Sequence, residues 1–156
     1  MTLNFGDLLE SVAQVVPERQ AIIYADKRYT WAEFDTQANR LARNLIELGL
    51  MPNSKVAFYL RNSPAYVVSL AACFKARLVH VNVNYRYVDQ ELHYVIDNAD
   101  AELVVFDQEF AGQIDQLAPR LPKVKAFLAV GPAEDSVRAL SFERLCLQGE
   151  GAPVTL

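Results

Sequence analysis

Apolar residues recur along the chain in two rhythms. Spacings of three and four residues predict helices, whereas short alternating or continuous apolar runs predict strands. The predicted helices cover residues 4–16, 30–48, 63–76, 88–98, 111–118 and 142–147. The predicted strands cover residues 20–24, 28–30, 55–60, 78–83, 102–106 and 124–130. Strands and helices alternate from residue 55 onward, which predicts an α/β fold with a mainly parallel sheet and helices on both faces.

Capping residues mark where several of these elements begin and end. Thr30 and Glu33 form a capping box, in which each side chain accepts a hydrogen bond from the other residue's backbone amide. Ser63 is the expected N-cap of the third helix, with Pro64 at its first position. Gly49 is a typical left-handed end for the second helix.

The pattern also predicts two details of packing. We expect the β-branched strand 78–83 to lie in the interior of the sheet. We expect the helix 88–98 to pack through the four apolar residues that share one of its faces, which are Val88, Leu92, Val95 and Ile96.

Composition narrows the class of protein. The 156 residues are 52% hydrophobic and 22% charged, as in an ordinary globular domain, which we place at residues 1–147 with a linker-like tail at 148–156. The net charge of −4 and the lack of a basic stripe argue against nucleic-acid binding. No run of apolar residues is long enough for a membrane span, and the start does not resemble a signal peptide. The sequence therefore predicts a cytoplasmic location.

The sequence holds no recognisable catalytic motif. A phosphate-binding loop needs clustered glycines before a helix, but the only close pair, Gly149 and Gly151, precedes a proline. Asp89, His93 and Asp97 share a helical face, yet we expect them to face solvent and to bind no metal, since a solvated polar face is the common case. We therefore assign no catalytic and no metal-binding residue.

Polar residues surround the end of strand 78–83. His80, Asn82 and Asn84 alternate with valines, and ligands of open α/β sheets bind outside the carboxyl ends of strands. These three side chains either hold neighbouring loops or face a ligand, and the sequence leaves their roles open. Arg86 is the better candidate for ligand binding, because a planar guanidinium suits a phosphate.

Several segments resemble, in their residues, order and spacing, the N-terminal portion of the adenylate-forming superfamily, which includes acyl-CoA synthetases. The matching segments are YTWAEF (29–34), ANRLA (38–42), LGL (48–50), VAFYLRNSP (56–64), VNVNYRY (81–87) and ELHYVIDNADA (91–101). The segment 82–87 is most similar to fatty-acyl and steroid-side-chain acyl-CoA synthetases. The resemblance departs at Arg77, where the family often has a glycine. If Arg77 keeps the positive φ that such a glycine adopts, it is strained.

This resemblance implies the first subdomain of an adenylate-forming enzyme. The complete enzyme would join a fatty or steroid side-chain acid to CoA, using ATP and Mg²⁺, and the family's phosphate loop and catalytic lysine are not among these residues. The resemblance also implies that Arg86 contacts the CoA nucleotide. We thus expect an N-terminal fragment without catalysis of its own, which has the remainder of the enzyme as partner and leaves a homodimer open. The alternative is a stand-alone binding or scaffolding module.

Overall fold

The computed structural model describes residues 4–132 and 139–154. Five parallel strands form the main sheet in the order β4-β3-β5-β6-β7. Their bounds are β3 Lys55–Tyr59, β4 Val79–Asn82, β5 Ala101–Asp107, β6 Ala126–Val130 and β7 Ala139–Ser141. The predicted α/β class with a parallel sheet is confirmed, and the short β7 is an addition that the sequence pattern did not reveal.

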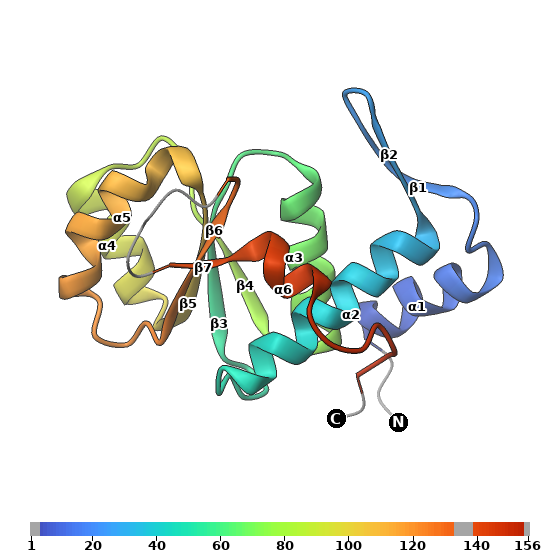
Figure 1. The fold of residues 1–156 in the computed structure, drawn as a ribbon. Helices are drawn as coiled ribbons and strands as arrows, with labels where there is room; N and C mark the ends of the chain where they lie inside the picture. The colour runs from blue at the N-terminus through green and yellow to red at the C-terminus, as the bar shows by residue number, and fades with distance from the viewer. Residues whose placement is uncertain (1–3, 133–138, 155–156) are drawn as a thin grey trace.

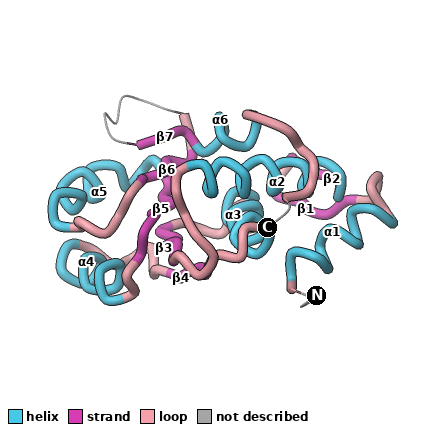
Figure 2. The backbone as a smooth tube through the Cα atoms, turned by 90° about the horizontal axis from the view of Figure 1, so that it is seen from below, coloured by secondary structure: helices cyan, strands magenta, loops and turns pink. Residues whose placement is uncertain are grey.

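Helices cover both faces of the sheet, as predicted (Figures 1 and 2). One face carries α2 (Trp31–Glu47), α3 (Pro64–Lys75) and α6 (Phe142–Leu147). The other face carries α4 (Asp89–Asn98) and α5 (Ala111–Leu117), with the short turns η1 (Gln108–Phe110) and η2 (Ala118–Arg120). The helix α1 (Phe5–Val15) packs against α2 and α3, and a hairpin of β1 (Gln20–Tyr24) and β2 (Lys27–Thr30) projects beside them.

Alternate side chains of the central strands are buried on opposite faces, so the molecule has two hydrophobic cores. Val56 and Phe58 of β3 lie in the core beneath α2, α3 and α6, whereas Ala57 and Tyr59 lie in the core beneath α4 and α5. All four are fully buried. Continuous apolar runs are the expected sequence of a parallel strand covered on both faces.

The predicted capping residues are confirmed. Thr30 and Glu33 form the capping box, Ser63 caps α3, and Gly49 ends α2 with φ +86°. At the start of α1, Asn4 and Asp7 form a second capping box. Local polar chemistry therefore sets the ends of these helices, as the sequence indicated.

A buried ammonium joins three helices. The Lys75 side chain on α3 is only 4% exposed, and its Nζ lies 2.8 Å from Asp35 Oδ1 of α2 and 3.7 Å from Glu10 Oε2 of α1. Asn39 Nδ2 donates hydrogen bonds to Asp35 Oδ2 and to the carbonyl of Gly151, so the network also reaches the tail. A buried charge is tolerated only with such partners, so Lys75 requires the helices to pack this way.

One packing prediction was wrong, and another was wrong at one of its four residues. The strand predicted to be interior, residues 78–83, contains β4, which is the edge strand of the sheet and has only β3 as a neighbour within the described residues. An edge position explains its polar alternation, because Asn82 stays exposed and needs no buried partner. Val88 is 50% exposed because α4 begins one residue later, at Asp89, while Leu92 and Ile96 are fully buried and Val95 partly so.

Arg77 adopts the strained conformation that its position was expected to require. It has φ +56°, its amide donates to the carbonyl of Phe74, and the Leu78 amide donates to that of Cys73. These two bonds form a Schellman motif at the end of α3, a position that favours glycine. A residue with a Cβ loses about 1–2 kcal/mol in this region.

We predict that Arg77→Gly stabilises the chain. Relief of the left-handed strain outweighs the added freedom of glycine in the unfolded chain, which costs about 0.4–1 kcal/mol, so the net gain is about 0.5–1 kcal/mol. Chemical denaturation measures it. The matched control is Gly49→Ala, where φ is +86° and an added Cβ meets nothing within 4 Å. This control should lose about 1 kcal/mol from backbone strain alone. Equal stability of Arg77→Gly and the parent chain would contradict the strain argument.

Candidate functional site

The strand order creates a switch point between β3 and β5. From β3 the chain passes to β4 on one side, and from β4 it returns to β5 on the other. The loops that follow β3 and β5 therefore leave the sheet in opposite directions, and open α/β sheets bind ligands at such points. The loops after β3, β4 and β5 form the candidate site.

Arg61, just after β3, crosses the switch point. Its amide donates a 2.7 Å hydrogen bond to Asp107 Oδ2, and its Nε lies 2.6 Å from Glu109 Oε1. Both partners in the ion pair are 51% exposed, so solvent screens their attraction and the pair adds little to stability. Burial raises the pKa of the Asp107 carboxyl, opposed by the hydrogen bond from Arg61. The main consequence of Arg61 is geometric, because it holds two loops together.

The loop after β4 is held from below by a buried tyrosine. The Tyr59 hydroxyl donates to the carbonyl of Tyr87 at 2.7 Å and lies 2.5 Å from Gln113 Oε1. Burial raises the pKa of Tyr59, so its hydroxyl stays protonated and remains a donor. Within the loop, the Arg86 amide donates to Asn84 Oδ1 at 3.0 Å. The backbone at residues 84–87 is therefore well fixed although its side chains reach solvent.

Two guanidinium groups flank Tyr85. The Cζ of Arg61 lies 4.6 Å from the centre of the Tyr85 ring, and that of Arg86 lies 5.6 Å from it. Arg86 is exposed, and its side chain makes no ion pair within the described residues. The structure thus places Arg86 where the sequence predicted, on a loop at the carboxyl end of a strand. Its contact with a nucleotide stays a prediction.

The three polar residues around β4 contribute in different ways. Asn84 holds its own loop, and Asn82 Oδ1 accepts a long hydrogen bond of 3.4 Å from the Tyr66 hydroxyl. His80 lies half-buried beside the rings of Phe58 and Phe74, at centroid distances of 5.8 and 6.2 Å. Of the three, Asn84 thus bonds within a loop, Asn82 contacts α3 and His80 packs against aromatic rings. Their roles toward a ligand stay open.

The polar face of α4 contacts protein rather than solvent alone. Asp89 pairs with Arg120 at 2.5 Å, His93 Nε2 lies 3.1 Å from the carbonyl of Arg120, and Asp97 pairs with Lys123 at 3.0 Å. Each of these three potential metal ligands therefore contacts a different protein group. Within residues 4–132 and 139–154, no group of three His, Cys, Asp or Glu residues is arranged to hold a metal.

Sequence reasoning overlooked Arg61, Tyr59 and the acidic pair Asp107 and Glu109. A usable signal was present, because these residues end or follow the predicted strands 55–60 and 102–106. Adjacent parallel strands bring their carboxyl ends together, but the strand order had to be known before these loops could be paired.

Comparisons with known proteins agree on one family. The model of the family described as "AMP-binding enzyme" matches residues 9–148. The chain is 38% identical over 135 residues to a 3-oxocholest-4-en-26-oate–CoA ligase from Rhodococcus rhodochrous, covering 86% of this chain and 24% of the relative. It is 37% identical to a medium/long-chain-fatty-acid–CoA/3-oxocholest-4-en-26-oate–CoA ligase from Mycobacterium tuberculosis, covering 86% of this chain and 25% of that relative. The chain thus spans about a quarter of the length of these relatives.

Solved structures share the fold. The acetoacetyl-CoA synthetase from Streptomyces lividans has a TM-score of 0.89 at 23% identity, covering 98% of this chain and 26% of that one. The N-terminal domain of FACL13 from Mycobacterium tuberculosis has a TM-score of 0.87 at 22% identity, covering 99% of this chain and 38% of that one. The predicted first subdomain of an adenylate-forming enzyme is therefore confirmed as the fold of this chain.

We predict that Tyr59→Phe loosens the loop after β4. The change removes one hydroxyl and leaves the Tyr87 carbonyl without its donor, at a cost of about 1–3 kcal/mol. Hydrogen exchange should accelerate at the amides of residues 85–88. Tyr66→Phe is the matched control, since the bond it removes is long and exposed. The assignment of Tyr59 is wrong if both variants change the exchange of this loop equally.

Proposed function

Because the chain belongs to the family of AMP-binding enzymes, we propose that it is the N-terminal region of an ATP-dependent acyl-CoA ligase. In the reaction, a carboxylate attacks the α-phosphate of ATP, an acyl-adenylate forms and pyrophosphate leaves. The CoA thiol then displaces AMP. The observation that carries this proposal is the identity of more than a third to ligases of fatty and steroid acids, over most of the chain.

A narrower substrate class follows from the same relatives. Their names specify medium- and long-chain fatty acids and a cholestenoic acid, so we propose a fatty or steroid side-chain acid as substrate. Ligases of this family generally use ATP, Mg²⁺ and CoA. The described residues include no group suited to a metal and no glycine-rich loop, so we assign them no step of metal or nucleotide chemistry.

Arg86 is the residue that we propose to meet a substrate. Its side chain is exposed and has no acidic partner within the described residues, and its backbone amide is hydrogen-bonded to Asn84 Oδ1. It lies outside the carboxyl ends of β3 and β4. A guanidinium there suits the nucleotide phosphates of CoA. Such a contact is remote from the reacting carbonyl and would stabilise ground state and transition state alike.

Location and assembly remain predictions. None of the helices in the described part of the chain combines the length and apolar character that crossing a bilayer requires. We propose a cytoplasmic location, since acyl-CoA formation draws on cytoplasmic ATP and CoA. A homodimer also stays a prediction.

We predict that these 156 residues alone do not form an adenylate, whereas the complete ligase does. Charge on the transferring phosphates must be neutralised by positioned groups, and these residues supply none that we recognise. Pyrophosphate exchange, measured with ATP and a panel of fatty and steroid acids, separates the two cases. Acid-dependent exchange by the 156 residues would contradict the first part. If no acid of the panel supports pyrophosphate exchange by the complete protein, the scaffolding alternative is favoured.

In the complete ligase, we predict that Arg86→Ala raises the KM for CoA by about ten- to a hundredfold, because a charge-assisted hydrogen bond contributes about 1.5–3 kcal/mol. Adenylation should be unchanged, since CoA enters afterwards. Arg86→Lys should recover only part of the loss, because lysine keeps the positive charge but lacks the bidentate geometry of the guanidinium. Steady-state kinetics of both half-reactions test this. Unchanged CoA kinetics with a lower melting temperature would make Arg86 structural.

A further inference from the structure

The tail that follows α6 is bound along α2. Residues 148–154 belong to no helix or strand, and they pass beside α2 in Figure 1. Gly149 has φ +85° just after the C-cap of α6, a position where the left-handed region favours glycine. Further along, Val154 packs against the core beneath α2, α3 and α6. The tail is therefore fixed at its start by a turn and near its end by an apolar contact.

Two buried amides of α2 donate hydrogen bonds to this part of the chain. Asn39 Nδ2 donates to the carbonyl of Gly151 at 2.9 Å. Asn44 Nδ2 donates to the carbonyls of Leu145 and Gln148, at 2.9 and 3.2 Å. The two asparagines are only 1% and 5% exposed, so water has little access to take the place of these acceptors. The bonds therefore favour the docked path of the tail over a detached one.

Two arginines extend this row of donors along α2. Arg40 Nε donates to the carbonyl of Gly149 at 3.2 Å, and Arg43 Nη2 donates to that of Ala152 at 3.3 Å. Residues 39, 40, 43 and 44 lie on neighbouring turns of one helical face. We call these four side chains the carbonyl clamp, because all their acceptors in α6 and the tail are backbone carbonyls. The clamp therefore fixes the path of the main chain rather than the side chains of the tail.

Gly151 lies too close to α2 for a larger residue. A Cβ added there would lie 2.6 Å from Thr36 Cγ2, a distance that real Cβ atoms essentially never show. Its φ lies outside the left-handed region, so the position requires glycine for the close approach of two segments and not for its conformation. Gly112 differs, since a Cβ added there meets nothing within 4 Å. The close approach brings the carbonyl of Gly151 within reach of Asn39.

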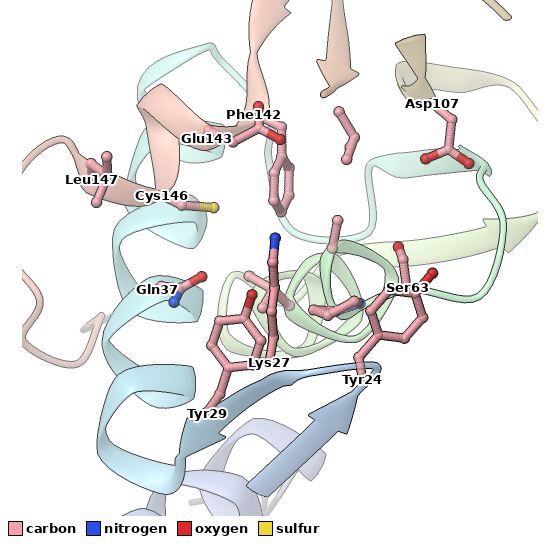
Figure 3. A pocket seen from close by; sticks show the side chains of 14 residues that line it. Tyr24, Lys27, Tyr29, Gln37, Ser63, Asp107, Phe142, Glu143, Cys146 and Leu147 are labelled. Carbon is pink, nitrogen blue, oxygen red and sulfur yellow. The ribbon is translucent and has the colours of Figure 1, made fainter. Parts of the chain in front are cut away.

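The clamp also holds one wall of a cavity at the switch point. The cavity has a volume of about 380 Å³ and lies between the hairpin, which contributes Lys27, and α6 (Figure 3). Phe142 and Cys146 of α6 line it. The helix α6 has only six residues, and Asn44 binds the carbonyl of Leu145 near its end. The donor that holds the start of the tail thus also holds this wall.

We propose that the carbonyl clamp makes the tail a rigid joint, which fixes where the longer chain of the complete protein leaves this subdomain. A flexible linker would instead allow a broad distribution of distances between the two parts. The proposal rests on the proposed function in one respect, because it places the reacting groups beyond the joint and Arg86 before it. Asn39, Asn44 and Gly151 are then positioning residues, which act through the path of the main chain.

Proteolysis of the complete protein at Glu150 tests the joint. Glu150 is exposed within the tail, and a glutamate-specific protease can cut after it only when the tail leaves α2. The rate of this cut therefore reports the population of the detached tail. Mass spectrometry of the denatured digest identifies the product, residues 1–150. We expect Gly151→Ala to raise the initial rate at least about fivefold, because the added Cβ displaces the tail.

The double variant of Gly151→Ala with Thr36→Ser should return the cut to the rate of the parent protein, since serine lacks the methyl group that the new Cβ meets. This rescue also separates a detached tail from a direct effect of residue 151 on the protease. Arg40→Met together with Arg43→Met leaves the cleavage site intact, removes two donors and should raise the rate as well.

Gly112→Ala and Arg19→Met are the matched controls. They make the same changes away from the tail, in α5 and in the exposed loop before β1, and should leave the rate of the cut unchanged. Equal rates for the parent protein and all the loosened variants would show that the tail is a flexible linker and would overturn the proposal. So would a double variant that stays as sensitive as Gly151→Ala.

Pyrophosphate exchange by the same proteins tests the positioning role. Exchange should fall at least about threefold in Gly151→Ala and recover with Thr36→Ser, because a displacement of about 1 Å can cost up to about a hundredfold in rate. Unchanged exchange by a protein with a detached tail would contradict this role. If the parent protein shows no exchange with any acid, the proposed ligase fails, and the rates of the cut at Glu150 still decide whether the joint is rigid.

Discussion

The structure depends on β3 being buried on both faces. Its even-numbered side chains, Val56 and Phe58, belong to one core, while Ala57 and Tyr59 belong to the other. The strand also pairs with β4 on one edge and with β5 on the other. Because a single strand supplies both cores and two ladders of hydrogen bonds, the two layers of helices cannot separate without breaking it. We infer that the two cores unfold as one cooperative unit.

The same strand determines where ligands can approach. Since β3 lies between β4 and β5 and all three strands are parallel, the loops that follow them meet at one end of the sheet. Arg61 bridges to the loop after β5. Tyr59 holds the loop after β4 from within the core, and Arg86 lies exposed on that same loop. On the α3 side of this end, the hairpin encloses the cavity that contains Lys27. Rigid strands thus position flexible side chains, as in many α/β binding sites.

Local patterns predicted most of the elements, because the relevant physics lies within a few residues. Capping at Thr30 and Ser63 and the positive φ at Gly49 follow from near neighbours. The strained φ at Arg77 was instead expected from the glycine that the resembling family often has at this position. The order of the strands does not, and the polar alternation of β4 was assigned to the interior although it is typical of an edge.

The candidate site could be predicted only in part, for the same reason. Arg86 was found because it directly follows a strand, whereas the contact between Arg61 and Glu109 joins residues 48 positions apart. The cavity around Lys27 likewise combines the hairpin with distant strand ends, and the buried pair of Lys75 and Asp35 joins two separate helices. Such contacts depend on tertiary packing, which spacing along the chain does not reveal.

Native-state hydrogen exchange in increasing denaturant tests the central claim, that β3 unites the two cores. The slowest amides should be those of β3 and β5, and they should exchange only through global unfolding. The buried turns of α3 in one core and of α4 in the other should converge on the same free energy as denaturant rises. If α4 and α5 instead exchange through a separate unfolding step, with their own smaller free energy, while β3 and α3 stay protected, the cores are independent and the account is wrong.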